Sequence, residues 1–381
     1  MSKVSLIGCN SYDHENVYDS VLRGINLLGG FSQLLNSNDR ILLKPNLLTG
    51  EKPEKCVTTH PEVFRAIGEI LSSEGNLSLS YGDSPAFGSL EKAAKISGIK
   101  KVADSLGIKT ADFKGVDNQQ YPQGILLKRL PLSKGIGNID SLISISKMKT
   151  HALTRITGAV KNQFGCVPGI LKGEFHVKMP DIEDFSKMLI DINNFIKPKL
   201  FIMDGIMAME GNGPRSGNPV PMNVLLFSTD PVALDTVFCK LIGLNPSFVP
   251  TIKLGHKYGL GTSDLNEIDI IGDKLNDYRK DDFKVERKPY EKFDSKKHFP
   301  FFLKNIISPK PVIDYDLCKN CGKCVLQCPT DPKAVNWKDD DTSKPPVHDY
   351  NRCIRCYCCQ EICPYGAISV KTPLLGKLIR R

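Results

Sequence analysis

The sequence predicts an α/β fold, in which a large domain with a mainly parallel sheet precedes a small α+β domain of the ferredoxin type. Strand-like and helix-like segments alternate over residues 1–285, and eight cysteines near the C-terminus form two runs of one spacing. A chain of 381 residues is long enough for more than one domain. We place a basic linker at 286–311, the cluster domain at 312–371 and a basic tail at 372–381.

Seven short apolar segments of the first domain are predicted as strands, because turn residues bound them. They are 3–7, 40–43, 77–81, 141–146, 200–203, 223–227 and 268–271. The clearest helices are 62–73, which follows a Thr-His-Pro-Glu start and stops near Gly75, and 232–241, which the cap segment Thr229-Asp230-Pro231 opens and Gly243 ends. Strands that alternate with helices favour an open parallel sheet, whose ligands bind beyond the carboxyl ends of the strands.

The two cysteine runs have the spacing C-x2-C-x2-C-x3-C-P, which is typical of bacterial ferredoxins. In that pattern three cysteines hold one cluster and the fourth reaches the other, so two 4Fe–4S clusters are predicted. One ligand set is Cys318, Cys321, Cys324 and Cys363. The other is Cys353, Cys356, Cys359 and Cys328. Zinc sites use a different spacing. Cys358 breaks the register and is interpreted as a spare thiol.

Charge and the remaining cysteines limit which cellular compartment and which partners we expect. Five further cysteines belong to neither ligand set and no signal pattern opens the chain, which favours a cytoplasmic protein. The net charge is +9, but residues 1–285 hold only about +2 of it, so no nucleic-acid partner is expected. No apolar stretch approaches the length of a membrane span. The linker, with Phe299, Phe301 and Phe302, is expected to pack on a neighbouring domain; contact with an anionic lipid surface is the alternative.

Polar and cationic residues follow four of the predicted strands, where a ligand pocket is expected. They include Lys44, Asn46, Asp83, Lys147, Lys149, His151, Arg155, Lys161, Asn162, Asp204 and Arg215. Lysine, arginine and loop amides together favour a pocket for a small anionic molecule or nucleotide. Neither G-x-G-x-x-G nor G-x-x-x-x-G-K-[ST] is present in a suitable place, so the usual signatures of NAD and ATP sites are missing.

Several segments of the first domain resemble the domain of unknown function 362 family. They are Leu43-Lys44-Pro45-Asn46, Thr59-His60-Pro61-Glu62, Gly82-Asp83-Ser84-Pro85, His151 through Gly169, Met203-Asp204-Gly205, Glu210 through Pro214 and Asp230 through Asp235. The resemblance covers nearly all of residues 1–285. Members of that family commonly occur fused to ferredoxin-type clusters, and the family implies no settled reaction.

A narrower similarity links the same domain to nickel-pincer lactate racemases. It rests on His151, Gly158, Lys161, Pro168-Gly169 and His176. The resemblance implies that Lys161 bears a nickel-pincer nucleotide, that His176 ligates the metal, and that His60 and His151 form an acid/base pair. The chain departs from those racemases at Gly158-Ala159-Val160, where they have two adjacent glycines, and they lack ferredoxin clusters.

The sequence therefore predicts an iron–sulfur oxidoreductase that passes low-potential electrons to a small anionic substrate or cofactor in the α/β domain. An electron donor or acceptor protein is the expected partner. The candidate catalytic residues are His60, His151 and Lys161, and the candidate binding residues are Lys44, Arg155, Asn162 and Arg215. Two alternatives remain open: an electron carrier or cluster-bearing maturation protein without its own substrate, and a racemase- or epimerase-like enzyme with structural clusters.

Overall fold

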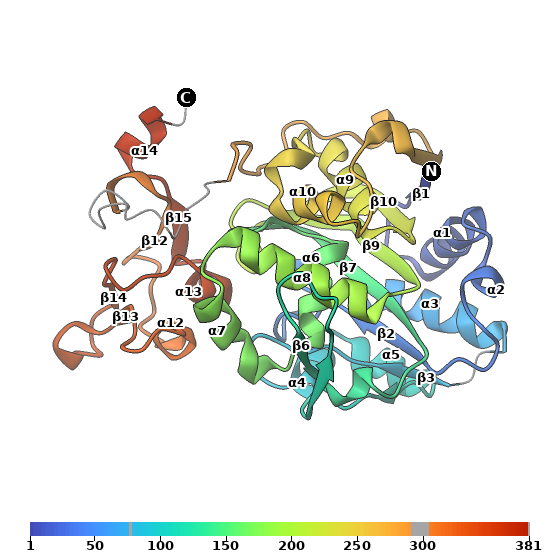
Figure 1. The fold of residues 1–381 in the computed structure, drawn as a ribbon, viewed down its shortest axis with the longest axis horizontal. Coiled ribbons are helices and arrows are strands. Elements are labelled where there is room, and N and C mark those ends of the chain that lie inside the picture. Colours follow the sequence, from blue (N-terminus) through green and yellow to red (C-terminus); the bar gives the residue numbers. More distant parts are fainter. Residues whose placement is uncertain (76–77, 291–304, 380–381) are drawn as a thin grey trace.

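A computed structural model describes residues 1–75, 78–290 and 305–379, and Figure 1 shows a large α/β domain with a small domain beside it. The large domain is built on a nine-stranded sheet of order β11-β1-β10-β9-β7-β2-β3-β4, with β8 paired to β7. Its strands are β1 (Ser2–Gly8), β2 (Ile41–Pro45), β3 (Leu79–Tyr81), β4 (Lys109–Thr110), β7 (Ser141–His151), β8 (Arg155–Thr157), β9 (Leu200–Glu210), β10 (Asn218–Ser228) and β11 (Ile268–Gly272). A separate hairpin joins β5 (Val116–Gln120) to β6 (Arg129–Ser133).

The sheet is mainly parallel, as predicted. Strands β9, β7, β2, β3 and β4 pair in parallel, as do β1 and β11, whereas β10 runs antiparallel to β1 and β9. Every residue of β2 and β7 is buried, which requires that both faces of the sheet are covered. All seven predicted strands are present; residue 77, the predicted start of the third, lies outside the described residues.

Helices cover the sheet in two groups, one around α1, α3 and α5 and the other around α6, α8, α9 and α10 (Figure 1). The helices of the large domain are α1 (His14–Leu27), α2 (Phe31–Leu34), α3 (Pro61–Ser73), α4 (Leu90–Ile96), α5 (Ile99–Ser105), α6 (Ala159–Asn162), α7 (Gly169–Lys178), α8 (Ile182–Ile196), α9 (Pro231–Leu241) and α10 (Pro250–Lys257). Asp230 caps α9 by accepting from the N–H groups of Val232 and Ala233, which confirms that predicted start.

Strand β7 continues five residues beyond its predicted end, so Lys147, Lys149 and His151 lie within the strand and not in the loop that follows it. The prediction was wrong here because β7 leaves its neighbour β2 at Ile145 and continues beside β9. Polar residues in a doubly buried strand lack the alternation that marks a strand in the sequence. Strand β9 likewise continues to Glu210.

The first residues of the predicted linker pack on the large domain, since the Tyr290 hydroxyl donates to Glu183 at 2.9 Å. Its last residues belong to the small domain, where β12 (Lys310–Ile313) pairs antiparallel with β15 (Ile368–Lys371). The predicted packing of Phe299, Phe301 and Phe302 on a neighbouring domain falls on a segment that lies outside the described residues. The small domain also contains α12 (Lys323–Gln327), β13 (Val335–Asn336), β14 (Val347–His348), α13 (Cys358–Ile362) and α14 (Leu374–Ile379).

The two halves of the small domain repeat one backbone conformation around the second cysteine of each run. Residues with positive φ flank Cys321, namely Asn320 and Gly322, and residues with positive φ also flank its counterpart in the second run, namely Arg355 and Tyr357. In each half a short helix begins directly afterwards, α12 in the first and α13 in the second. The two halves thus repeat this local structure, and Cys358 occupies the position that Lys323 has in the first half.

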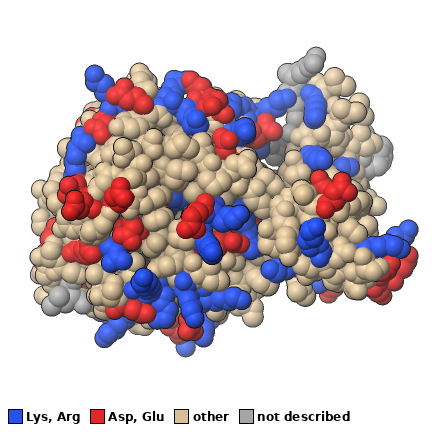
Figure 2. Space-filling view, turned by 180° about the vertical axis from the view of Figure 1, so that it is seen from behind, with Lys and Arg blue, Asp and Glu red and all other residues tan. Residues whose placement is uncertain are grey.

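Acidic and basic residues are interspersed over the back of the large domain in Figure 2. Within residues 1–75, 78–290 and 305–379, none of the helices combines the length and the apolar character needed to cross a bilayer.

Candidate functional site

The eight cysteines of the two runs surround two separate cavities of the small domain. One cavity is lined by Cys318, Cys321, Cys324 and Cys363. The other is lined by Cys328, Cys353, Cys356 and Cys359. In each case the fourth cysteine of one run crosses to the cavity of the other, which is the grouping that the spacing predicts.

The surroundings of these thiols fit iron–sulfur clusters. Val325, Val335 and Ile368 pack around them, and the N–H of Ala334 donates to the Cys328 sulfur at 3.3 Å. Among the described residues no three His, Cys, Asp or Glu side chains converge on a point where one metal ion would bind. Thiols spread around a cavity suit a cluster, because each iron takes its own cysteine.

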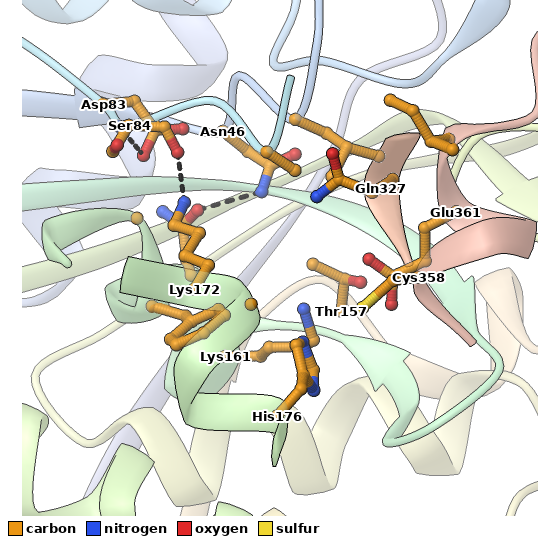
Figure 3. Close-up of a pocket in the computed structure, with 17 residues that line it drawn as sticks. Asn46, Asp83, Ser84, Thr157, Lys161, Lys172, His176, Gln327, Cys358 and Glu361 are labelled. Carbon is orange, nitrogen blue, oxygen red and sulfur yellow. Dashed lines mark hydrogen bonds between the residues drawn. The ribbon is translucent and has the colours of Figure 1, made fainter. Parts of the chain in front are cut away.

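A further cavity lies between the two domains and is called the interdomain pocket here (Figure 3). The large domain lines it with Asn46, Leu48, Asp83, Ser84, Ala86, Thr157, Lys161, Asn162, Phe164, Gly165, Lys172, Gly173 and His176. The small domain contributes Gln327 of α12 and Cys358, Glu361 and Ile362 of α13. One wall of the pocket is therefore made by the two helices that also carry cysteines of the two runs.

Two lysines give the pocket its positive charge. The ammonium groups of Lys161 and Lys172 lie 5.9 and 5.4 Å from the centre of the Phe164 ring. Burial lowers the pKa of Lys161, and it lowers the pKa of Lys172 to about 8. The Lys172 ammonium also donates to the carbonyl oxygen of Ser84. Among the described residues, no hydrogen bond or ion pair engages the Lys161 ammonium, which lines the pocket.

On the large-domain side of the pocket, Lys44 and Asp83 form a buried ion pair with 2.9 Å between Nζ and Oδ1. Asp83 also accepts from the backbone N–H groups of Leu47 and Ser84, at 2.6 and 2.9 Å. Gly165 lies directly over the pair, and a Cβ at this position would come within 2.6 Å of the Lys44 ammonium. Lys44 itself does not line the pocket; it holds the carboxylate of Asp83, which does.

The candidate binding residue Asn162 belongs to a network of buried amides at the pocket floor. Its Oδ1 accepts from Asn46 Nδ2 at 3.0 Å, and Asn46 Oδ1 accepts from the Lys149 ammonium at 2.8 Å. Burial lowers the pKa of Lys149 to about 7. Lys149 lies next to Asn46 and helps to hold that side chain in place, and its ammonium also donates to the carbonyl oxygen of Val57.

His176 lines the pocket, whereas His151 reaches it only through a partner. The His176 ring stacks on Phe185 with 4.8 Å between ring centres, and burial lowers its pKa to about 4. His151 Nδ1 accepts from the backbone N–H of Leu153, which leaves Nε2 facing the Glu361 carboxylate at 3.0 Å. Burial lowers the pKa of His151 to about 4, so the imidazole is neutral near pH 7.

The structure does not bring His60 to the pocket. Its ring stacks on Tyr12 with 3.5 Å between ring centres, and its Nδ1 caps α3 by accepting from Glu62 N–H. Tyr12 and Lys147 both bond Asp204, at 2.9 and 2.8 Å. This network is satisfied internally, so His60 and His151 do not form a pair around Lys161.

The two candidate arginines hold chain segments together outside the pocket. Arg155 donates to the carbonyl oxygens of Lys288 and Pro289, at 3.1 and 3.2 Å. Arg215 donates to Glu51 at 2.9 Å and to the carbonyl oxygen of Ile362 in α13. Arg215 thus fastens the glycine-rich loop of the large domain to a helix of the small domain.

The same loop makes further contacts with α13. Gln360 donates from Nε2 to Asn212 Oδ1 at 2.8 Å, and the Ser216 hydroxyl donates to the carbonyl oxygen of Cys363 at 2.9 Å. These contacts hold the loop against α13 and the residue that follows it.

The pocket residues that the interpretation of the sequence did not assign to the site include Phe164, Lys172, Gln327, Cys358 and Glu361. The last three lie inside the cysteine runs, where the spacing of the cysteines is the dominant pattern. Only the irregular position of Cys358 marked it, and the structure places this thiol at the pocket and not at either cysteine-lined cavity.

Residues 41–240 match the family model described as Domain of unknown function (DUF362). The chain belongs to the DUF362 family. Residues 310–364 of this DUF362 protein match a second model, described as 4Fe-4S dicluster domain. A thylakoid-associated protein of Synechocystis sp. is 37% identical to the DUF362 protein over 261 residues, which is 68% of this chain and 80% of the relative.

Two solved structures resemble this DUF362 protein at 12% sequence identity. The lactate racemase apoprotein from Thermoanaerobacterium thermosaccharolyticum has a TM-score of 0.41 over 64% of this chain and 56% of its own. A protein from Thermotoga maritima has a TM-score of 0.33 over 59% and 57%. The DUF362 protein therefore spans little more than half of each of these structures, and no activity is transferred from them.

Proposed function

We propose that this DUF362 protein is an iron–sulfur oxidoreductase that reduces a small anionic molecule in the interdomain pocket. One observation carries the proposal: the pocket is walled on one side by α12 and α13, and both helices include cysteines that line the cluster cavities. A bound molecule would thus lie beside the cluster domain without a further protein between them.

Two 4Fe–4S clusters would be held by the cysteines of the two cavities, four to each. Bound clusters supply low-potential electrons one at a time. Cys321, in the first set, is exposed, so an electron donor protein can approach this side of the domain. Cys358 and Glu361, from the helix that carries Cys359, face the pocket instead.

The charge of the pocket supports an anionic ligand. Lys44 is neutralised by Asp83, whereas Glu361 keeps its negative charge beside the neutral His151 and offsets part of the charge of the two pocket lysines. Lys161 and Lys172 remain to bind a carboxylate or phosphate group. Because the pocket restricts the access of water to these lysines, their attraction to a bound anion is stronger than it would be in open solvent. The Asn46 and Asn162 amides line the same pocket and add polar groups that can orient a ligand.

Reduction of a carbonyl group or a carbon–carbon double bond requires protons as well as electrons. A lysine with a pKa of about 8, such as Lys172, can donate a proton from Nζ near neutral pH. The charge of Lys161 favours the accumulation of negative charge on a molecule that gains electrons, and its ammonium has no competing ion pair among the described residues.

A racemase-like function has less support. Lys161 and His176 share the pocket, as the resemblance implies, but His60 lies in a separate network. The proposed acid/base pair of His60 and His151 is therefore not assembled around Lys161, and we derive no step through a nickel-pincer nucleotide.

The test is reoxidation of the reduced protein by small anions in the absence of any protein partner. Holoprotein reduced under anaerobic conditions and freed of reductant is mixed with pyruvate or fumarate, and the visible absorbance of the clusters is followed. Lactate and succinate, which cannot accept electrons, serve as matched controls. We expect an acceptor with a carboxylate to reoxidise the clusters, and Lys161→Ala and Lys172→Ala to slow this about tenfold or more.

Lys178→Ala is the control variant, because Lys178 lies on α7 near Lys172 but is exposed and pairs with Glu174. All variants should keep the iron content of the wild type. If small anions never reoxidise the clusters but acceptor proteins do, the protein is an electron carrier and the proposal is wrong.

A further inference from the structure

The C-terminal helix α14 exposes an apolar surface on the small domain. Leu374, Leu375 and Leu378 are 79%, 52% and 61% exposed. Large apolar side chains that are exposed together mark interaction surfaces more often than singly exposed ones do. In Figure 1, α14 lies at the end of the small domain away from the sheet of the large domain, so this surface is separate from the interdomain pocket.

Close packing on one side of α14 determines which side of the helix carries the exposed leucines. Gly376 faces the carbonyl group of Ile307, and a Cβ at position 376 would come within 2.8 Å of that carbonyl carbon. Only glycine permits this approach, which places one side of α14 against residue 307. Leu374 and Leu378, four residues apart on one side of the helix, are left uncovered by the described residues.

The surroundings of the leucines are basic. Residues 362–381 contain four Lys or Arg residues and no Asp or Glu. Lys377 lies on α14, and Lys371 at the end of β15 pairs across the sheet with Lys310 of β12. Neither Lys371 nor Lys377 forms an ion pair with a described residue.

We propose that α14 docks this protein on an anionic lipid surface. Leucines beside uncompensated cations satisfy both requirements of peripheral membrane binding, because the leucines enter the boundary between head groups and acyl chains while the cations attract acidic head groups. A protein partner of comparable affinity would need a larger complementary surface than one helix of six residues provides. Lipid binding through α14 would set the location of the protein and does not depend on the reaction in the pocket.

The test is co-sedimentation of the holoprotein with vesicles of phosphatidylcholine alone or mixed with phosphatidylglycerol. We expect binding to the mixed vesicles that weakens as salt is raised, and little binding to phosphatidylcholine. The double variant Leu374→Ser with Leu378→Ser should reduce the bound fraction at limiting lipid roughly tenfold, since two apolar anchors are lost. Lys377→Glu should reduce it several-fold.

The control is the double variant Ile170→Ser with Val177→Ser on α7, whose side chains are 85% and 42% exposed but are not part of this surface. It should bind vesicles like the wild type, and cluster absorbance should be unchanged in every variant. Equal binding by the α14 variant and the wild type, equal loss in the α7 control, or no binding of the wild type to anionic vesicles would each overturn the proposal. A soluble protein would be the occupant of the surface in the last case.

Discussion

Gly165→Ala is the change that tests most directly how the pocket is built. Gly165 has an ordinary negative φ, so the side chain and not the backbone conformation is what the site excludes. An added Cβ would lie 2.6 Å from the Lys44 ammonium and 2.9 Å from the Asp83 carboxyl carbon, and both distances are shorter than real Cβ atoms tolerate. The ion pair must therefore open or the backbone must move.

The size of the effect follows from the burial of the pair. The Lys44 side chain is fully buried and that of Asp83 is 5% exposed, so water cannot replace the lost contact. Disrupting a buried ion pair costs about 3–5 kcal/mol. Replacing glycine by alanine returns about 0.4–1 kcal/mol through the unfolded chain. A net loss of about 3 kcal/mol corresponds to a melting temperature lower by roughly 6–12 °C in a domain of this size.

Thermal unfolding of the anaerobic holoprotein, followed by far-ultraviolet circular dichroism, measures this change. Gly173→Ala is the matched control, because Gly173 also lines the pocket but lies in α7, where a Cβ would meet Pro329 at an ordinary 3.4 Å. We expect the control to be neutral or slightly stabilising. Equal melting temperatures for Gly165→Ala and Gly173→Ala would refute the argument from close packing.

Three further predictions concern the metal content, the pH dependence and the contact between the domains. Anaerobically purified protein should contain about eight irons and eight sulfides per chain, and Cys358→Ser should leave both unchanged; loss of a cluster in that variant would contradict the ligand assignment. Affinity for an anion that is active in the reoxidation assay should fall as the pH rises through about 8, because Lys172 loses its charge; an affinity that rises over that range would exclude a role for this cation. Arg215→Ala should increase proteolysis between the domains without loss of iron, since it frees the carbonyl oxygen of Ile362; unchanged proteolysis would show that the other contacts of α13 suffice.

Much of the fold could be predicted from local sequence patterns. Asp230 and the residues after it specify a helix start through hydrogen bonds within three residues, and the structure has that start. The end of β7 could not be predicted in this way. Lys147 and Lys149 are strand residues because β9 continues beside them. Their ammonium groups donate hydrogen bonds to Asp204 and Asn46, respectively. These partners are far away in the chain, so local sequence does not indicate them.

The site was predicted less completely, for a related reason. Lys161 and Asn162 follow a strand in the sequence and line the pocket, whereas His60 precedes a helix and caps it. Glu361 and Gln327 belong to the cluster domain, and nothing local in the sequence indicates that these residues meet Lys161 across a domain boundary. The placement of pocket residues depends on how the two domains dock, through contacts such as those of Arg215 and Asn212 with α13.

The wall that α12 and α13 give to the pocket links ligand binding to the maturation of the protein. Each of these helices has only five residues and lies between cysteines of two different sets, so its position depends on metal that ties both halves of the small domain together. A chain that has not yet received iron would present an open hollow with lysines and no opposing wall. Under the proposed function, the pocket would therefore bind its ligand only after the clusters are in place.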